Sequence, residues 1–156
     1  MTERKIVALA DIYPEMKEIL DSGGEFSFIS TGVSMTPMLG NRTHTVYLKK
    51  PALPLKKNDI PLVQRDDGSF VLHRVVGRDK NGYILCGDHQ AAYEHGIKDG
   101  NIIGVLSRYR CPDGRIITVD DREYKKYVRK ISVIRPLRYV YHKIRVFLRL
   151  SPRDAK

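Results

Sequence analysis

Short β-prone runs separated by closely spaced turns fill the middle of the chain and limit its fold more than any other feature. They occupy residues 25–121, and Gly- and Asp-rich turns at 66–69 and 79–82 come between them. The runs cover residues 26–30, 45–48, 60–63, 70–76, 83–86, 102–106 and 116–119. Roughly seven short strands at this spacing predict a mainly β fold, arranged as a folded ribbon or a barrel.

A short helix is expected before this β-rich domain, within residues 1–24. Its apolar positions fall on one helical face. That face consists of Ile12, Met16, Ile19 and Leu20. Pro14 suits the first turn of a helix and Gly23 suits its end, so we predict a helix that packs on the body of the protein.

The last segment, residues 122–156, is predicted to be a basic amphipathic helix. It has no acidic residue between Lys125 and Leu150, and its apolar positions follow a 3-4-3-4 spacing. Those positions are Ile134, Leu137, Tyr141, Ile144 and Leu148, widened by Val133, Val140 and Phe147. Pro136 fits a first helical turn, and Ser151 with the following proline fits a stop.

Such a helix is typical of segments that lie in a membrane interface. The alternative is a helix docked on the domain with its basic side in water. Nucleic acid is a weaker alternative, because the helix offers no polar set of side chains for reading bases. The expected partners are therefore a peptide or protein substrate and an anionic membrane surface.

Composition narrows the setting of the protein. The 156 residues carry a formal net charge of +10, which favours an anionic partner. Two cysteines are too few for a disulfide framework and indicate a reducing compartment. No run of residues is apolar enough to span a membrane, and the N-terminus does not resemble a signal peptide. We expect a cytoplasmic protein, peripheral on the inner face of the membrane if the last helix binds lipid.

The candidate catalytic residues are a serine, a histidine and two acids near the ends of expected strands. Ser34 lies between a turn glycine and a proline, and His73 lies inside an apolar run. Asp88 and Glu94 follow the next expected strand. A serine needs a neighbouring base to become a nucleophile, and the base needs an orienting acid, so this set predicts a hydrolase. Thr36 stands where a nucleophile elbow has its second glycine, which excludes the α/β-hydrolase type.

The order of the motifs resembles the signal peptidase I family, within the superfamily that includes the LexA-like self-cleaving repressors. The specific elements are Gly-x-Ser34-Met-x-Pro and Leu-His73-Arg-Val-Val-Gly. The weaker elements are Asn58-Asp, Gly-Asp88 and Ile-Gly104, and the resemblance spans residues 31–106.

The resemblance implies a LexA/signal-peptidase-like β fold and a serine endopeptidase that cleaves after a small residue in an extended segment. It implies Ser34 as the nucleophile and His73 as the general base, as in the ER and archaeal type. Glu94 falls at the place of the third catalytic group, and Asp88 matches the aspartate of the Gly-Asp pair. The Ser34 backbone N–H would meet the oxyanion, with Thr31 as a further candidate. No recognised metal-ligand spacing is present among His89, Glu94 and His95, so no metal is expected, and no cofactor is expected either.

Each site residue also has a structural interpretation. Ser34 can be a turn serine, His73 a buried structural histidine, Glu94 a loop acid and Asp88 a turn-stabilising acid. The corresponding alternative for the whole chain is a catalytically inactive peptide-binding or membrane-surface adaptor of the same fold. If neutral His73 is the base, activity should rise with pH through the titration of that histidine.

Overall fold

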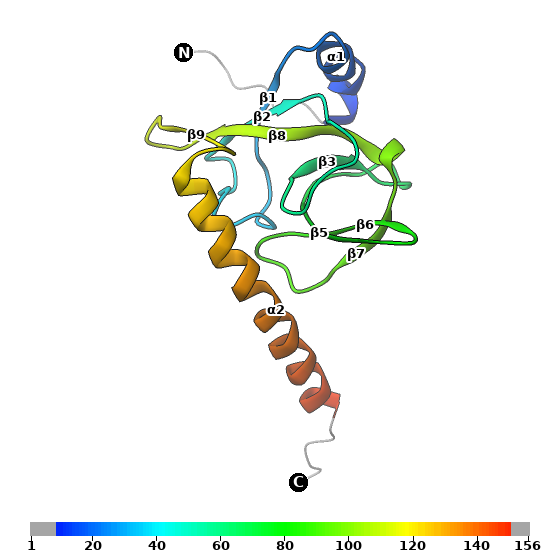
Figure 1. Ribbon diagram of the computed structural model, residues 1–156, viewed down its shortest axis with the longest axis vertical. Helices are drawn as coiled ribbons and strands as arrows, with labels where there is room; N and C mark the ends of the chain where they lie inside the picture. The colour runs from blue at the N-terminus through cyan, green and yellow to red at the C-terminus, as the bar shows by residue number, and fades with distance from the viewer. Residues whose placement is uncertain (1–8, 151–156) are drawn as a thin grey trace.

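The computed structural model describes residues 9–150, apart from the side chains of Phe147, Arg149 and Leu150 at its end. It is mainly β, with a helix before the strands and a helix after them (Figure 1). The elements are α1 Leu9–Asp21, β1 Phe26–Ile29, β2 Thr45–Lys49, β3 Pro61–Gln64, β4 Phe70–Leu72, β5 Arg74–Asp79, β6 Gly82–Cys86, β7 Glu94–Ile97, η1 Asp99–Asn101, β8 Ile102–Arg110, β9 Ile116–Thr118 and α2 Arg122–Leu150.

Two antiparallel sheets make up the β domain. The larger one has the strand order β1-β2-β8-β3-β4, with β9 also paired to β8. The smaller one has the order β5-β6-β7. Shifts of register in the β2–β8 and β3–β8 pairs mark irregularities that help a sheet to curl. The expectation of a mainly β domain is confirmed, and the larger sheet is curled (Figure 1).

The expected strand at 70–76 is two strands, and the break between them falls at His73. β4 pairs with β3 in the larger sheet, whereas β5 pairs with β6 in the smaller sheet. His73 is therefore the residue at which the chain leaves one sheet for the other. A strand that the sequence did not indicate, β7, begins at Glu94 and pairs with β6.

The apolar side chains of the domain form two cores. The first core lies between α1 and the larger sheet and includes Met16, Leu20, Val46 and Leu106. It also takes in three apolar side chains from the loop that carries Ser34. These are Met35, Met38 and Leu39, each at most 6 % exposed. The second core is shared by the two sheets, with Val63 from β3 of the larger sheet and Val75, Tyr83 and Leu85 from the smaller one. The serine loop is thus fixed by packing as well as by its backbone.

Helix α1 buries Met16 and Leu20 as its periodicity predicts, but its position on the sequence differs from the expectation. Pro14 lies inside the helix and not in its first turn, since the helix already includes Leu9. Gly23 takes a φ of +85°, and the Gly24 N–H donates to the Ile19 carbonyl at 2.8 Å. This is the hydrogen-bonding pattern by which a glycine ends a helix.

Helix α2 is one continuous helix of 29 residues, and Pro136 lies near its middle. The prediction that Pro136 opens the helix is wrong, and the predicted stop at Ser151 lies outside the described residues. Inside a helix, proline removes the hydrogen bond to the carbonyl four residues earlier and its ring crowds that carbonyl, so packing on the domain must offset this cost in α2. The helix starts beside β9, passes the smaller sheet and extends beyond the rest of the molecule (Figure 1).

Helix α2 packs on the domain and leaves Lys126, Arg129 and Lys130 in water, but most of the apolar positions expected from the sequence are exposed. Tyr124, Ile131 and Arg135 face the domain and are at most 6 % exposed. Val133 and Leu137, on the other side of the helix, are about two-thirds exposed, at 64 % and 65 %. Within residues 9–150, no helix has the length and apolar character needed to cross a membrane.

Candidate functional site

Ser34 lies at the tip of a loop whose backbone is held from both sides. Gly32 takes a φ of +87°, and its N–H donates to the Asn41 side-chain oxygen at 2.9 Å. On the other side, the Ser34 carbonyl accepts the N–H of His89 at 2.8 Å. Within the described part of the chain, the N–H and the hydroxyl of Ser34 have no hydrogen-bond partner. Both groups are therefore available to a bound molecule.

The loop of Ser34 rests directly on the turn that carries Asp88. A Cβ atom added at Gly87 would come 2.6 Å from the Ser34 carbonyl oxygen. Real Cβ atoms do not approach backbone oxygen so closely, so only glycine allows the two turns to meet here. The Gly-Asp pair in the sequence thus acts through its glycine on the position of the serine.

His73 is buried, with a side chain that is 5 % exposed. Its Nδ1 atom lies 3.6 Å from the Glu94 Oε2, which is longer than a hydrogen bond, and no other partner is found for Nδ1 among the described residues. Burial lowers the pKa of His73 below its ordinary value, and the charge of Glu94 offsets only part of that effect. The ring is therefore neutral at pH 7, the state in which an imidazole can accept a proton.

Glu94 is held by an arginine that the sequence analysis did not consider. Arg65 donates to both carboxylate oxygens, from Nε at 2.6 Å and from a terminal nitrogen at 2.7 Å. These hydrogen bonds lower the pKa of Glu94. Glu94 is thus an ionised acid beside His73 and does not have the character of an isolated loop acid. Arg65 and Glu94 are 29 positions apart in the sequence, so no local pattern indicates the pair.

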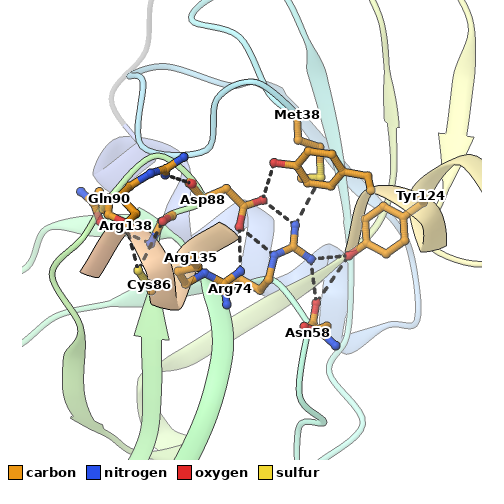
Figure 2. A network of polar contacts seen from close by, with 11 residues as sticks. Met38, Asn58, Arg74, Cys86, Asp88, Gln90, Tyr124, Arg135 and Arg138 are labelled. Atoms are coloured by element: carbon orange, nitrogen blue, oxygen red, sulfur yellow. Dashed lines mark hydrogen bonds and ion pairs between the residues drawn. The ribbon is translucent and has the colours of Figure 1, made fainter. Parts of the chain in front are cut away.

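Asp88 belongs to a separate network in the interior (Figure 2). Its carboxylate accepts two hydrogen bonds from Arg74, at 2.8 Å and 2.6 Å. It also accepts the Tyr127 hydroxyl at 3.1 Å and the Arg135 guanidinium at 3.3 Å, while Arg138 donates to the Asp88 backbone carbonyl. The last three donors all come from α2. None of the hydrogen bonds found for the Asp88 carboxylate involves His73.

The partner of Asp88 in the domain, Arg74, is also completely buried. Burial alone would lower its pKa, but hydrogen bonds and charge from Asp88 outweigh burial and raise the pKa above its ordinary value. Arg74 also donates to the Tyr124 hydroxyl at 3.0 Å and to the Asn58 carbonyl at 3.2 Å (Figure 2). The network therefore joins the β domain to α2 through charged groups that water does not reach.

A small cleft opens beside Ser34. Its volume is about 110 Å³, and its walls are mostly apolar. It is lined by Leu9, Phe28, Ser30, Thr31, Gly32, Ser34, Met35, Leu39, Leu62, Phe70, Val71 and Leu72. These residues come from α1, β1, the serine loop, β3 and β4, and β4 leads directly into His73. A larger cleft of about 560 Å³ lies against α2 and includes neither Ser34 nor His73.

Of the four predicted site residues, only His73 and Glu94 lie within ion-pair distance of each other in residues 9–150. His73 and Glu94 lie together, and Ser34 lies at the cleft whose wall ends one residue before His73. Asp88 supports the serine loop through its turn and lies in the α2 network. No hydrogen bond joins the Ser34 hydroxyl to His73 in residues 9–150. Thr31, the further oxyanion candidate, lines the cleft and is exposed.

Other reactive groups near the site have different properties. Burial raises the pKa of the Cys86 thiol, so this cysteine is protonated at pH 7 and is a poor nucleophile. Arg65, Asn41 and the α2 donors are the residues that sequence reasoning missed. The basic character of α2 was visible in the sequence, but its contact with Asp88 depends on tertiary packing.

No protein-family model, no curated protein and no solved structure matches this chain, so its functional interpretation depends on the geometry described above.

Proposed function

We propose that the protein is a serine endopeptidase with a LexA/signal-peptidase-like fold, in which Ser34 is the nucleophile and His73 the general base. The observation that carries the proposal is the position of Ser34. Ser34 lies on a packed loop at an apolar cleft, and the strand that lines this cleft, β4, is followed directly by His73. His73 is buried and neutral, and the ionised Glu94 lies beside it. A nucleophile, a base and an orienting acid in this order are the parts of a serine hydrolase.

In the proposed reaction, the Ser34 Oγ attacks the carbonyl carbon of the scissile peptide bond while His73 takes the hydroxyl proton. The Ser34 N–H stabilises the oxyanion of the tetrahedral intermediate. His73 then gives its proton to the leaving amine, and an ester to Ser34 remains. Water hydrolyses this ester by the same proton transfers in reverse. Glu94 stabilises the imidazolium that forms in both steps.

The third catalytic group is assigned to Glu94 and not to Asp88. Glu94 is the acid beside Nδ1, at 3.6 Å, whereas the Asp88 carboxylate is occupied by Arg74, Tyr127 and Arg135. Hydrogen bonds between catalytic groups are often long before substrate binds and shorten in the complex. Asp88 is then a positioning residue, which acts on Ser34 through the turn that contacts it.

The proposed substrate is an extended peptide with a small residue before the scissile bond. The strands β1 and β4 are the two ends of the strand order in the larger sheet, and both contribute side chains to the cleft. An unpaired sheet edge can bind an extended peptide as an added strand. A cleft of about 110 Å³ suits a small side chain better than a large one.

The two free thiols agree with a reducing, cytoplasmic setting.

The direct test is covalent labelling with a fluorophosphonate probe, which reacts with activated serines. We expect labelling of the wild type and of Ser22→Ala, which removes an exposed serine outside the cleft. We expect none for Ser34→Ala or His73→Ala, provided that circular dichroism shows both to be folded. A folded wild type that stays unlabelled, with and without anionic vesicles, would contradict the peptidase proposal.

A survey of cleavage sites in a peptide library tests the substrate class separately. The expected result is a preference for small residues immediately before the cut, with cleavage lost in Ser34→Ala. Cleavage with no such preference would contradict the assignment of the cleft to that side chain.

One observation favours a second candidate, a peptide-binding or membrane-surface adaptor without activity. The Ser34 hydroxyl and His73 share no hydrogen bond in the described chain, as expected for a site that binds peptide but does not cut it. Peptide binding that persists in Ser34→Ala, together with an unlabelled wild type, would establish this function in place of the first.

A further inference from the structure

Helix α2 has two faces with different surroundings. The inner face carries Tyr124, Ile131 and Arg135 into the domain, and Arg135 and Arg138 bind Asp88 (Figure 2). Two of the basic residues of α2 therefore contact the domain, while others such as Lys126 and Lys143 remain exposed. What remains on the opposite side of the helix decides what α2 can bind.

The opposite side is apolar from residue 133 onward, and we call it the outer apolar face. Its members recur at spacings of three and four residues, so they lie along one side of the helix. They are Val133, Leu137, Val140, Tyr141, Ile144 and Leu148, with exposed fractions of 64 %, 65 %, 52 %, 62 %, 52 % and 51 %. From residue 133 to residue 148 the helix rises by roughly 24 Å. A continuous apolar strip of this length on a surface indicates a binding site.

The charges around the outer apolar face have one sign. Between Lys125 and Leu150 the sequence has no acidic residue. Lys126, Arg129 and Lys130 are exposed in the turns before the face begins. Lys143 and Arg145 are exposed along its length. The face is thus preceded and flanked by cations, and within α2 no carboxylate after Glu123 can neutralise them.

We propose that the outer apolar face of α2 lies in the surface of an anionic lipid bilayer, with the β domain on the water side of the helix. Helices that combine an exposed apolar strip with flanking lysine and arginine bind at the boundary between headgroups and acyl chains. The cations would meet anionic headgroups, and the apolar side chains would enter the acyl region. This partner does not depend on peptidase activity.

The charge distribution disfavours the other partners. A second copy of the chain would place the same cations against one another with no carboxylate from α2 between them. Such like-charge pairs oppose the association of two helices. A nucleic acid would satisfy the cations but would leave the apolar strip in water. An anionic bilayer satisfies both the charges and the apolar side chains.

The first experiment measures flotation of the full chain with vesicles of phosphatidylcholine alone and of phosphatidylcholine mixed with phosphatidylglycerol. We expect binding to the anionic vesicles only, weakened by added salt. The double variant Leu137→Glu/Ile144→Glu should bind at least about tenfold more weakly. The control Leu53→Glu/Ile116→Glu changes the net charge equally at two other exposed apolar residues, 48 % and 44 % exposed, and should bind within about threefold of the wild type.

A second experiment locates the face within the lipid, and it is possible because the chain contains no tryptophan. In Leu137→Trp the single indole should shift its emission to the blue with anionic vesicles and be quenched by brominated acyl chains. Tyr139→Trp is the matched control, because Tyr139 lies toward the domain and stacks on Tyr93 with ring centroids 5.0 Å apart. Its emission should not respond to vesicles.

Three results would overturn the proposal. The first is failure of the wild type to float with anionic vesicles. The second is equal binding by the two double variants. The third is a dimer, detected by light scattering, that Leu137→Glu/Ile144→Glu dissociates; it would assign the face to a second copy. Labelling of Ser34 by the fluorophosphonate probe is scored separately from flotation, so failure of this proposal and failure of the peptidase proposal give different results.

Discussion

Two acids of this protein, Asp88 and Glu94, each bind an arginine through both carboxylate oxygens, yet their surroundings differ. The Asp88–Arg74 pair is fully buried and takes further donors from α2. The Glu94–Arg65 pair is partly exposed, with side chains that are 24 % and 35 % exposed, and it lies beside His73. The same type of pair therefore holds elements together in the interior, as Asp88–Arg74, and leaves a carboxylate charge beside His73 at the edge of the domain, as Glu94–Arg65.

The difference teaches that the position of a carboxylate in the sequence is a weak guide to its role. Asp88 and Glu94 are six positions apart, and both follow β6. Asp88 is fixed by residues from two separate elements, β5 and α2, so moving it would disturb both of them. Glu94 is fixed by one arginine and has His73 as its other neighbour. The following predictions test this division, beginning with the largest expected effect.

Removal of the interior acid should damage stability most. Asp88→Ala leaves Arg74 and Arg135 buried without a counter-ion, and we expect the free energy of unfolding to fall by about 3–5 kcal/mol. Urea unfolding followed by circular dichroism measures the change. Glu94→Ala is the comparison, and it should cost at most about 1 kcal/mol because its pair is partly solvated. Equal losses for the two variants would contradict the division of roles.

Removal of the charge at the edge should damage catalysis instead. Glu94→Gln keeps the shape of the side chain but cannot stabilise a charged imidazolium. We expect kcat/KM to fall by about 100-fold or more, with little change in the unfolding transition. Steady-state cleavage of the best library peptide measures the effect. Full activity in Glu94→Gln would exclude Glu94 as the third catalytic group.

The pH profile of the wild type should reflect the buried state of His73. Since burial lowers its pKa, the neutral base is already formed below the ordinary histidine value of about 6.5. We therefore expect kcat/KM to be high at pH 7 and to fall as pH drops below about 6.5. A profile that rises only above neutral pH would indicate a different base.

The smallest effect tests the arginine at the edge. Arg65→Gln removes a cation that lowers the pKa of His73 and frees Glu94 to approach Nδ1. Both changes favour the imidazolium, so the acid limb of the kcat/KM profile should move to higher pH. The expected change is a shift of the limb with an unchanged plateau at pH 8. A shift to lower pH would contradict the arrangement of Arg65, Glu94 and His73.

The sequence predicted the elements that depend on local signals. The alternation in β2 buries Val46 and Leu48, and the glycine turns fall where the strands end. β7 was missed because its four residues begin with Glu94 and His95 and include a glycine, which gives no apolar pattern. The break at His73 was missed because the change of sheet occurs within a continuous β-prone run.

The candidate site was predictable in its residue types but not in its connections. Ser34 and His73 were identified from their motifs, whereas Arg65 became visible only when β3 and β7 were placed in space. The direction of α2 was also beyond the sequence. Of its apolar residues, Tyr124 and Ile131 face the core, whereas Leu137 and Ile144 are exposed, and Arg135 and Arg138 bind Asp88 on the inner side.

The contact between α2 and Asp88 also orders events during synthesis. Within residues 9–150 every strand precedes α2, so Arg74 is the side-chain donor to Asp88 until residues 127, 135 and 138 of α2 have left the ribosome. The turn beneath Ser34 is therefore completed last. A nascent chain in which α2 is incomplete lacks the contacts of α2 with the turn beneath Ser34. The residues of the candidate site are therefore translated before their support is complete.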